Sequence, residues 1–270
     1  MDVELRTQRG MRYGAWYVAE YRIRNMTKWI AEIVTVSFGN PIIYLLAIGV
    51  GVGSLVDANT GGNGINGVSY ITFLAPALLA TAAIQAAMDE TSFPTLEGFV
   101  WNKSFFGMNS TQLTGGQIVD GIMIAAFARA FLTAAAYLVV LLVFGAVTLA
   151  SIPMLFLIAS FAGLSFGALM LAATSFVKQD DGFFAIIARF VVAPMFSFSG
   201  TFYPLEQMPV FLQWIGWISP LWHSTNLSRS VSFGLEVPGW LMIVHVAFLA
   251  ISLIAGVLIA RRQFVSRLLK

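Results

Sequence analysis

The sequence predicts an all-α polytopic membrane protein with six transmembrane helices. Hydrophobic residues make up 58% of its 270 residues and charged residues only 10%, whereas an average soluble domain carries roughly 25% charged residues. Uncharged stretches of about 20 residues, long enough to cross the hydrocarbon core, recur along the chain. Lysine and arginine gather in alternate connections. We therefore expect residues 1–270 to form a single transmembrane domain.

Charged or turn-forming residues delimit each predicted span. The second ends at Asp89-Glu90, the fourth before Lys178-Gln179-Asp180-Asp181, and the sixth at Arg261-Arg262. The predicted spans are residues 33–56, 70–88, 122–147, 154–177, 183–202 and 240–260. Their interiors lack Asp and Glu, which argues against a proton- or sodium-coupled carrier.

The distribution of basic residues predicts the orientation. One side of the membrane would carry twelve Lys and Arg residues, and the other side only Arg229. Because positive residues concentrate in cytoplasmic loops, both termini are expected in the cytoplasm, in agreement with an even number of spans. The twelve are Arg6, Arg9, Arg12, Arg22, Arg24, Lys28, Lys103, Lys178, Arg261, Arg262, Arg267 and Lys270.

Two non-spanning segments are rich in aromatic residues. Residues 11–30 mix aromatic with basic side chains, which is typical of a helix in the cytoplasmic interface or of a simple basic anchor. Residues 203–239 combine prolines with apolar runs too short to cross, which predicts short re-entrant helices on the external side. The cytoplasmic segment 89–120 is expected to pack on its own bundle rather than to seat in a groove of a partner.

A few residues within or near the spans need separate interpretation. For Arg129 and Arg189 we favour snorkelling to the cytoplasmic boundary over a polar cavity or a bundle ion pair. Gly163-xxx-Gly167, like Gly49, Gly51 and Gly53, is expected to allow close helix packing. His223 and His245 are interpreted as isolated residues, and without Cys or an HExxH motif we expect no metal site.

The usual catalytic motifs are absent from the sequence. It has no GxxxxGK[ST] phosphate loop, no GxSxG elbow and no cysteine. A net charge of only +2 does not favour nucleic-acid binding. Energy for uphill transport would therefore have to come from another chain.

One long segment carries a family resemblance. Residues 196–209 read Phe-Ser-Phe-Ser-Gly-Thr-Phe-Tyr-Pro-Leu-Glu-Gln-Met-Pro, and an aromatic run, Ser219-Pro220-Leu221, His223 and Arg229 follow. This order resembles the signature of the membrane subunit of ABC type-2 exporters, most of all the permeases of nodulation lipo-oligosaccharide export and daunorubicin-type resistance. Residues 90–121 look like the family's cytoplasmic segment after the second span, although Gln112-Leu113-Thr114 stands where a proline-containing turn often lies.

The resemblance implies a permease that exports an amphipathic, lipid-like or hydrophobic cargo (lipo-oligosaccharide, glycolipid or drug-like compound). Two permeases, as a homodimer or with a sister subunit, would form the pore in a bacterial inner membrane. Two cytoplasmic ABC ATPase subunits would bind ATP and Mg²⁺, so this chain would need no cofactor or catalytic residue of its own. A non-transporting membrane scaffold and a lipid-modifying membrane enzyme are the alternatives.

The same resemblance implies three groups of site residues. The ATPase-coupling residues would be Phe93, Leu96, Trp101, Lys103, Phe105 and Phe106, with Arg12 and Trp16 of the interface helix. The translocation path or gate would include Phe38, Tyr44, Phe73, Phe190, Met195, Phe196 and Phe198. The signature that caps the exit would be Ser199, Gly200, Pro204, Pro209, Pro220, His223 and Arg229.

Overall fold

The chain is helical along nearly all of its length in a computed structural model, which confirms the predicted all-α class. The structure describes residues 3–62, 64–179 and 182–269, with the backbone alone over residues 3–11. Asp180, Asp181 and Lys270, which the sequence analysis used to delimit a span or to assign the orientation, lie outside the described residues.

Within the described residues, five helices are long and apolar enough to cross a membrane. They cover Arg12–Asn59, Tyr70–Val100, Gly115–Val143, Leu149–Phe176 and Gly239–Leu268. These helices correspond to five of the six predicted spans. The predicted fifth span, residues 183–202, is a shorter apolar helix, Phe183–Phe198, so six crossings are not confirmed.

The first long helix bends where its helix type changes. It comprises α1 (Val3–Met26), the 3-10 turn η1 (Thr27–Trp29), α2 (Ile30–Tyr44), the π-helical stretch η2 (Leu45–Val52) and α3 (Gly53–Asn59). α1 packs along α7, and Gly121 makes this approach possible, because a Cβ there would lie 2.5 Å from the Cβ of Val18. By contrast, most of the α2 surface is exposed.

A tight elbow follows α4 (Tyr70–Thr91). Ser92 turns the chain into α5 (Phe93–Val100), and Lys103, with a φ of 52°, precedes α6 (Ser104–Asn109). α7 (Gly115–Val143) starts well before the predicted Ile122 because Thr114 and Gln117 form a capping box. The Thr114 hydroxyl accepts from the Gln117 N–H at 3.2 Å, and the Thr114 N–H donates to Gln117 Oε1 at 3.0 Å.

The central helix is α8 (Ile152–Phe176), which follows η3 (Leu149–Ser151) and packs on α4, α7, α12 and α13. Gly163 and Gly167 face α4 closely, as predicted. A Cβ on Gly163 would lie 2.7 Å from the carbonyl oxygen of Ala83, and one on Gly167 would lie 3.0 Å from the Cβ of Ala87. Small residues thus bring these helix backbones together, as is common in membrane bundles.

The predicted fifth span is a helix of mixed type that ends early. It comprises α9 (Phe183–Ile187), the π-helical η4 (Ala188–Val192) and α10 (Ala193–Phe198). The helix stops at Ser199 because Gly200 adopts a φ of +74°, which breaks the helical path. The segment that follows contains η5 (Leu205–Gln207), α11 (Val210–Trp217) and α12 (Pro220–Phe233), and α13 (Gly239–Leu268) completes the fold.

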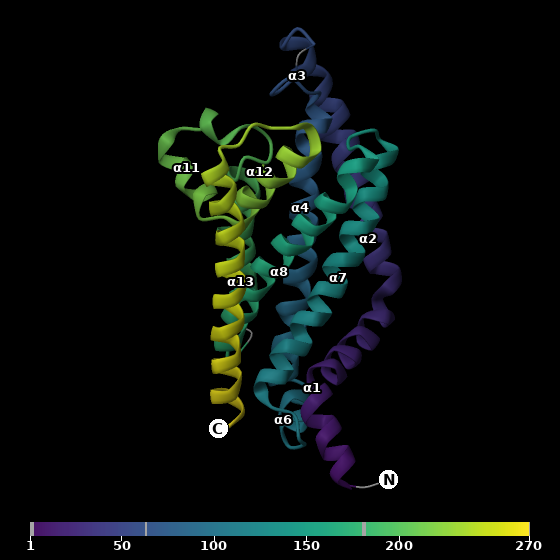
Figure 1. The fold of residues 1–270 in the computed structure, drawn as a ribbon, viewed down its shortest axis with the longest axis vertical. Helices are drawn as coiled ribbons and strands as arrows, with labels where there is room; N and C mark the ends of the chain where they lie inside the picture. The colour runs from purple at the N-terminus through teal and green to yellow at the C-terminus, as the bar shows by residue number, and fades with distance from the viewer. Residues whose placement is uncertain (1–2, 63, 180–181, 270) are drawn as a thin grey trace.

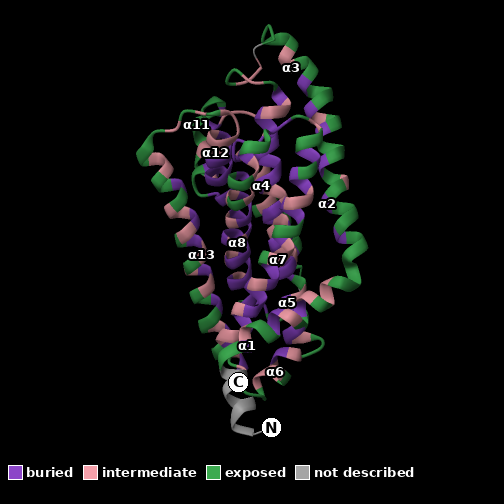
Figure 2. Ribbon diagram, turned by 45° about the vertical axis from the view of Figure 1, so that its right-hand side comes forward, coloured by how far each residue is buried: buried purple, intermediate pink, exposed green. Residues whose placement is uncertain are grey.

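The helices form an elongated bundle (Figure 1). Both ends of the chain and α6 lie at one end of the bundle, here called the terminal end, whereas α3, α11 and α12 lie at the opposite, distal end. Buried residues gather on α4, α7 and α8, and exposed residues run along α2 and α13 (Figure 2). The chain is therefore a multi-pass membrane protein with a packed centre and apolar outer helices.

Candidate functional site

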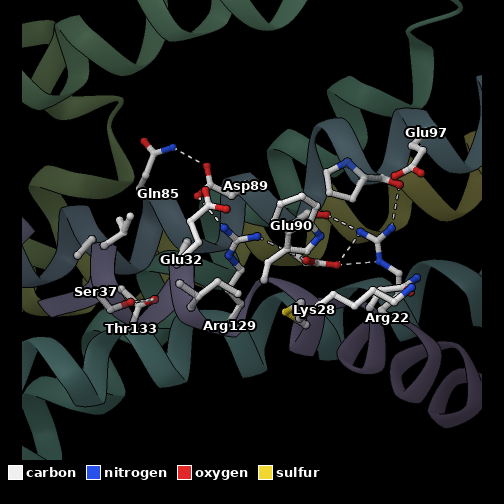
Figure 3. Close-up of a pocket in the computed structure, with 18 of the residues that line it drawn as sticks. Arg22, Lys28, Glu32, Ser37, Gln85, Asp89, Glu90, Glu97, Arg129 and Thr133 are labelled. Carbon is white, nitrogen blue, oxygen red and sulfur yellow. Dashed lines mark hydrogen bonds and ion pairs between the residues drawn. The ribbon is translucent and has the colours of Figure 1, made fainter. Parts of the chain in front are cut away.

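A buried ion pair joins α1 to the elbow after α4. The Nη2 atom of Arg22 lies 2.6 Å from Oε1 of Glu90, and Nε donates to the same oxygen at 2.7 Å. Nη2 also donates to the Glu90 carbonyl at 2.7 Å, and Nη1 donates to the Pro94 carbonyl at 2.8 Å (Figure 3). The side chains of Arg22 and Glu90 are only 6% and 3% exposed. The guanidinium therefore holds α1 to both α4 and the start of α5.

Arg129 of α7 meets the same acidic pair. Its Nη2 donates to Oδ2 of Asp89 at 3.1 Å, and its Nη1 lies 3.8 Å from Oε2 of Glu90. The prediction that Arg129 snorkels was wrong, because α7 passes the end of α4 where two carboxylates can pair with it. Arg189 is exposed on η4, so snorkelling stays a prediction for that residue alone.

The two ion pairs form part of the wall of a cavity of about 760 Å³. The cavity lies between the α1–α2 junction on one side and α4, α5 and α7 on the other (Figure 3). No pattern in the sequence predicted it, since its lining comes from segments far apart in the chain.

The candidate coupling residues divide into an exposed and a buried set. Leu96 and Phe105 are fully buried, and the Phe105 ring packs against Phe99 and Phe264 with centroids 5.0 and 5.6 Å away. Phe106 is partly buried. Such packing on the chain's own bundle is what the sequence analysis expected for segment 89–120. The exposed set consists of Arg12, Trp16, Phe93, Trp101 and Lys103.

The candidate path residues also separate by exposure. Tyr44 and Phe196 meet edge to face, with ring centroids 6.0 Å apart, so the first long helix and α10 approach each other here. Phe38 and Phe190 are exposed. By contrast, Phe73 and Met195 are buried within the chain, and Phe198 packs on the cluster beneath the distal helices.

The cap signature forms a dense cluster at the distal end. Arg229 is buried, and its guanidinium carbon lies 3.6 Å from the centroid of the Phe73 ring. Its Nε and Nη2 donate to the carbonyls of Phe73 and Thr201, each at 3.2 Å. Burial lowers the pKa of Arg229 to about 9, which leaves the guanidinium charged at neutral pH. Arg229 thus joins α12 to α4 and to the turn after α10.

Serine and proline residues of the signature shape the same cluster. Ser199 Oγ donates to Ser219 Oγ at 2.8 Å, and Ser219 Oγ accepts from the Leu221 N–H at 3.1 Å. Ser219 therefore caps α12, with Pro220 at the first helical position. Pro204 and Pro209 occupy the N-cap positions of η5 and α11, one residue before each helix begins.

His223 and His245 are hydrogen-bonded to each other, so the prediction that they are isolated was wrong. Their Nδ1 atoms lie 2.7 Å apart. His223 Nε2 lies 3.0 Å from the Trp217 carbonyl, which can only accept, so this nitrogen carries a proton. In a neutral His223, Nδ1 is then the acceptor and His245 Nδ1 is the donor. His245 Nε2 is left as a buried acceptor without a partner among the described atoms.

The histidine pair joins α12 to α13 inside an aromatic environment. The Phe248 ring stacks on His223 with centroids 4.0 Å apart, and Trp222 contacts both imidazoles. Across the described chain, no group of three or more His, Asp or Glu residues is placed to hold a metal ion. The pair thus links α12 to α13 through a buried hydrogen bond.

This fold, with ion pairs at one end and a signature cluster at the other, defines a helical, multi-pass membrane protein. The chain belongs to the ABC-2 type transporter family, which matches residues 18–233. It is accordingly the permease, the membrane subunit of an ABC transporter, and a subunit of this kind is not itself catalytic.

Curated relatives match over most of the chain. The chain is 29% identical to Nodulation protein J of Rhizobium leguminosarum bv. viciae over 260 residues, which cover 95% of this chain and 96% of the relative. It is 32% identical to Nodulation protein J of Neorhizobium galegae over 225 residues, or 82% and 83% of the two chains. The resemblance expected from the sequence is thus confirmed.

Proposed function

We propose that this permease belongs to an ATP-driven exporter that moves an amphipathic, lipid-like or hydrophobic cargo outward across a bacterial inner membrane. The observation that carries the proposal is the buried Arg22–Glu90 pair. It holds α1, which exposes Arg12 and Trp16, to the elbow that exposes Phe93 and Trp101. A displacement of this surface would be transmitted to α4 directly, because the connecting ion pair is buried and Arg22 donates three hydrogen bonds across it.

The excess of basic residues supports a cytoplasmic terminal end. In this orientation the surface of Arg12, Trp16, Phe93, Trp101 and Lys103, here called the coupling surface, would face cytoplasmic partners. We assign it to a separate ABC ATPase that binds ATP and Mg²⁺, with two copies serving two permeases. The second permease would be another copy of this chain or a sister subunit. Within this chain, α9–η4–α10 would form the short fifth crossing and so complete the six.

The nature of the path supports the class of cargo. Phe38 and Phe190 are exposed, and Tyr44 meets Phe196 edge to face. These rings offer an aromatic surface, and no charged residue takes part in the Tyr44–Phe196 contact. Such a surface suits an apolar moiety. Lipo-oligosaccharides, glycolipids and hydrophobic drug-like compounds all carry one.

Co-expression and co-purification with candidate ABC ATPase subunits, chosen for a Walker A motif, test the proposal. We expect a stable complex, and we expect Trp101→Ala and Trp16→Ala to weaken it and to reduce its stimulated ATP hydrolysis. Trp240→Ala is the matched control, since Trp240 is at least as exposed as Trp16 and Trp101 but lies at the start of α13, at the distal end. A folded permease that recruits no ATPase would contradict the proposal and favour a scaffold or a lipid-modifying enzyme.

A further inference from the structure

The cavity beside the ion pairs has the size of a ligand site. Its volume of about 760 Å³ falls within the roughly 300–1,000 Å³ that is usual for small-molecule pockets. It extends from the α5–α6 elbow, where Asn102 and Ser104 line it, to the middle of the bundle, where Asn40, Ala82 and Tyr137 line it. Because Asn40, Ala82 and Tyr137 belong to helices that are long and apolar enough to cross a membrane, the cavity extends into the candidate spans.

Each cationic side chain in the cavity wall already donates to a neighbouring residue. The Arg22 guanidinium donates to Glu90 and Pro94, and Arg129 donates to Asp89 (Figure 3). Lys28 donates to the side-chain oxygen of Asn25 at 3.2 Å. Because carboxylates outnumber cations four to three among the lining residues, the cavity has no surplus positive charge for a phosphate or carboxylate ligand.

Acceptors, in contrast, are available. Glu32 is exposed toward the cavity and has no hydrogen bond or ion pair with any described residue. Glu97 accepts a single bond, from the Asn102 amide at 3.1 Å. The Asn40 amide has no partner among the described side chains and can both accept and donate. The cavity therefore favours a ligand that brings many O–H donors and no negative charge.

Aromatic rings and exposed apolar surface surround these acceptors. Tyr21 and Trp29 line the cavity and remain 39% and 64% exposed, so their faces can stack against the apolar faces of a sugar ring. The neighbouring helix α2 is held to α7 by the Ser37–Thr133 hydrogen bond of 3.1 Å, and its outward side chains, such as Ile43, are exposed. An apolar tail next to α2 would thus lie in lipid while a polar headgroup occupies the cavity.

We infer that this cavity binds the uncharged, hydroxyl-rich headgroup of an amphipathic molecule, with the apolar tail in the membrane beside α2. The inference rests on the proposed function for placing the site at the cytoplasmic leaflet and for treating the ligand as cargo. The headgroup would make its hydrogen bonds to Glu32, Glu97 and Asn40, and its ring faces would contact Tyr21 and Trp29.

Photo-crosslinking to the purified full-length permease in phosphatidylcholine nanodiscs tests this inference. The probe is a dodecyl maltoside with a photoreactive tail, and the competitors are dodecyl maltoside, dodecyl phosphate and dodecyltrimethylammonium. We expect labelling on α2 that dodecyl maltoside displaces far better than either charged competitor. Asn40→Leu should weaken probe binding by about tenfold, the effect of losing roughly one hydrogen bond, and Glu32→Gln by less, because its amide oxygen still accepts but no longer carries a charge.

Thr35→Val is the control, since Thr35 lies on α2 outside the cavity lining. Equal labelling of Asn40→Leu and Thr35→Val, or equal displacement by a charged competitor, would overturn the inference. Glu32→Gln keeps the shape of the side chain, and each variant is checked for an unchanged unfolding temperature. ATPase recruitment is measured on the same preparations. Wild-type permease that recruits the ATPase but shows no labelling displaced by dodecyl maltoside would contradict only the cavity site, whereas such labelling without recruitment would contradict the proposed function.

Discussion

Arg22 holds Glu90 at two points, because its guanidinium donates to both the side-chain carboxylate and the main-chain carbonyl of that residue. The two residues are 68 positions apart in sequence. The contact therefore fixes the angle between the first helix and the last turn of α4, which lies at the base of the proposed headgroup cavity.

Removing one member of this pair should destabilise the protein strongly. Arg22→Ala leaves the buried Glu90 carboxylate with only its longer contact to Arg129, 3.8 Å away, and we expect a loss of about 3 kcal/mol in the free energy of unfolding. Denaturant titration of the purified permease in mixed micelles measures this change. Arg24→Ala is the control, since its pair with Glu20 is exposed and should contribute well below about 1 kcal/mol. Similar losses in both variants would contradict the assignment of a special role to Arg22.

Arg229 should be replaceable by lysine only in part. Arg229→Ala leaves the carbonyls of Phe73 and Thr201 without their buried donors, and we expect a loss of about 2 kcal/mol or more. Arg229→Lys keeps the charge but cannot donate to both carbonyls in the fixed geometry of a guanidinium. The unfolding temperature of this variant should therefore lie between those of the wild type and the alanine variant. An alanine variant as stable as the wild type would refute this account of the cluster.

Stability should decrease in acid because of His223. Burial lowers the pKa of His223 below its ordinary value of about 6.5, so the unfolded chain binds a proton more readily than the folded one. The stabilisation is complete above about pH 6.5 and is lost as the pH falls toward the folded pKa. We expect thermal unfolding curves of the wild type to shift more between about pH 7.5 and pH 5.5 than those of His223→Gln. Parallel shifts in the two proteins would rule out His223 as the cause.

Gly256 should be intolerant of any side chain. A Cβ there would lie 2.5 Å from the carbonyl carbon of Ala168, so Gly256→Val would force α13 away from α8. The expected loss is about 1–3 kcal/mol, as for other overpacked interiors, and a lower yield of monodisperse protein should accompany it. Gly39→Val serves for comparison, because a Cβ at Gly39 would meet no atom within 4 Å.

The absence of cysteine makes the orientation directly testable by labelling single-cysteine variants. We expect Ser110→Cys and Lys178→Cys to be protected from a membrane-impermeant maleimide in intact cells, and Asn59→Cys to be labelled. Glu206→Cys then reports on α9–η4–α10. Labelling at position 206 with protection at position 178 means that this short helix crosses, and protection at both positions means that it returns to the same side.

The lengths of the uncharged, apolar runs predicted most of the helices. The residues at which the helices begin and end depend instead on local contacts. The uncharged run that became α8 is continuous and lies within two residues of its predicted bounds. α7 begins earlier because the hydrogen bonds between Thr114 and Gln117 extend it through polar residues. The helix after Phe183 ends earlier because the conformation of Gly200 overrides a sequence that is still apolar. Hydropathy does not report either effect.

The polar contacts were harder to foresee, since they join residues that have no fixed spacing. His223 and His245 lie on different helices, and only the packing of α12 on α13 brings their rings together. Arg129 was assigned to the membrane boundary because its sequence neighbours are apolar, but its partner Asp89 belongs to another helix. Two adjacent carboxylates at the end of a span were the available signal, because such a cluster requires cations from elsewhere in the fold.

The two helices that meet at the Tyr44–Phe196 contact each contain a π-helical stretch, and such a stretch holds more residues per turn than an α-helix does. A π turn closes each hydrogen-bonded ring over one residue more than an α turn. Elsewhere in a span, deleting a residue rotates everything beyond it by about 100° and turns buried faces outward. Within Leu45–Val52 or Ala188–Val192, the surplus can instead be absorbed by tightening the helix to the ordinary form. These helices can therefore change length and rotation locally while their flanking segments keep their packing.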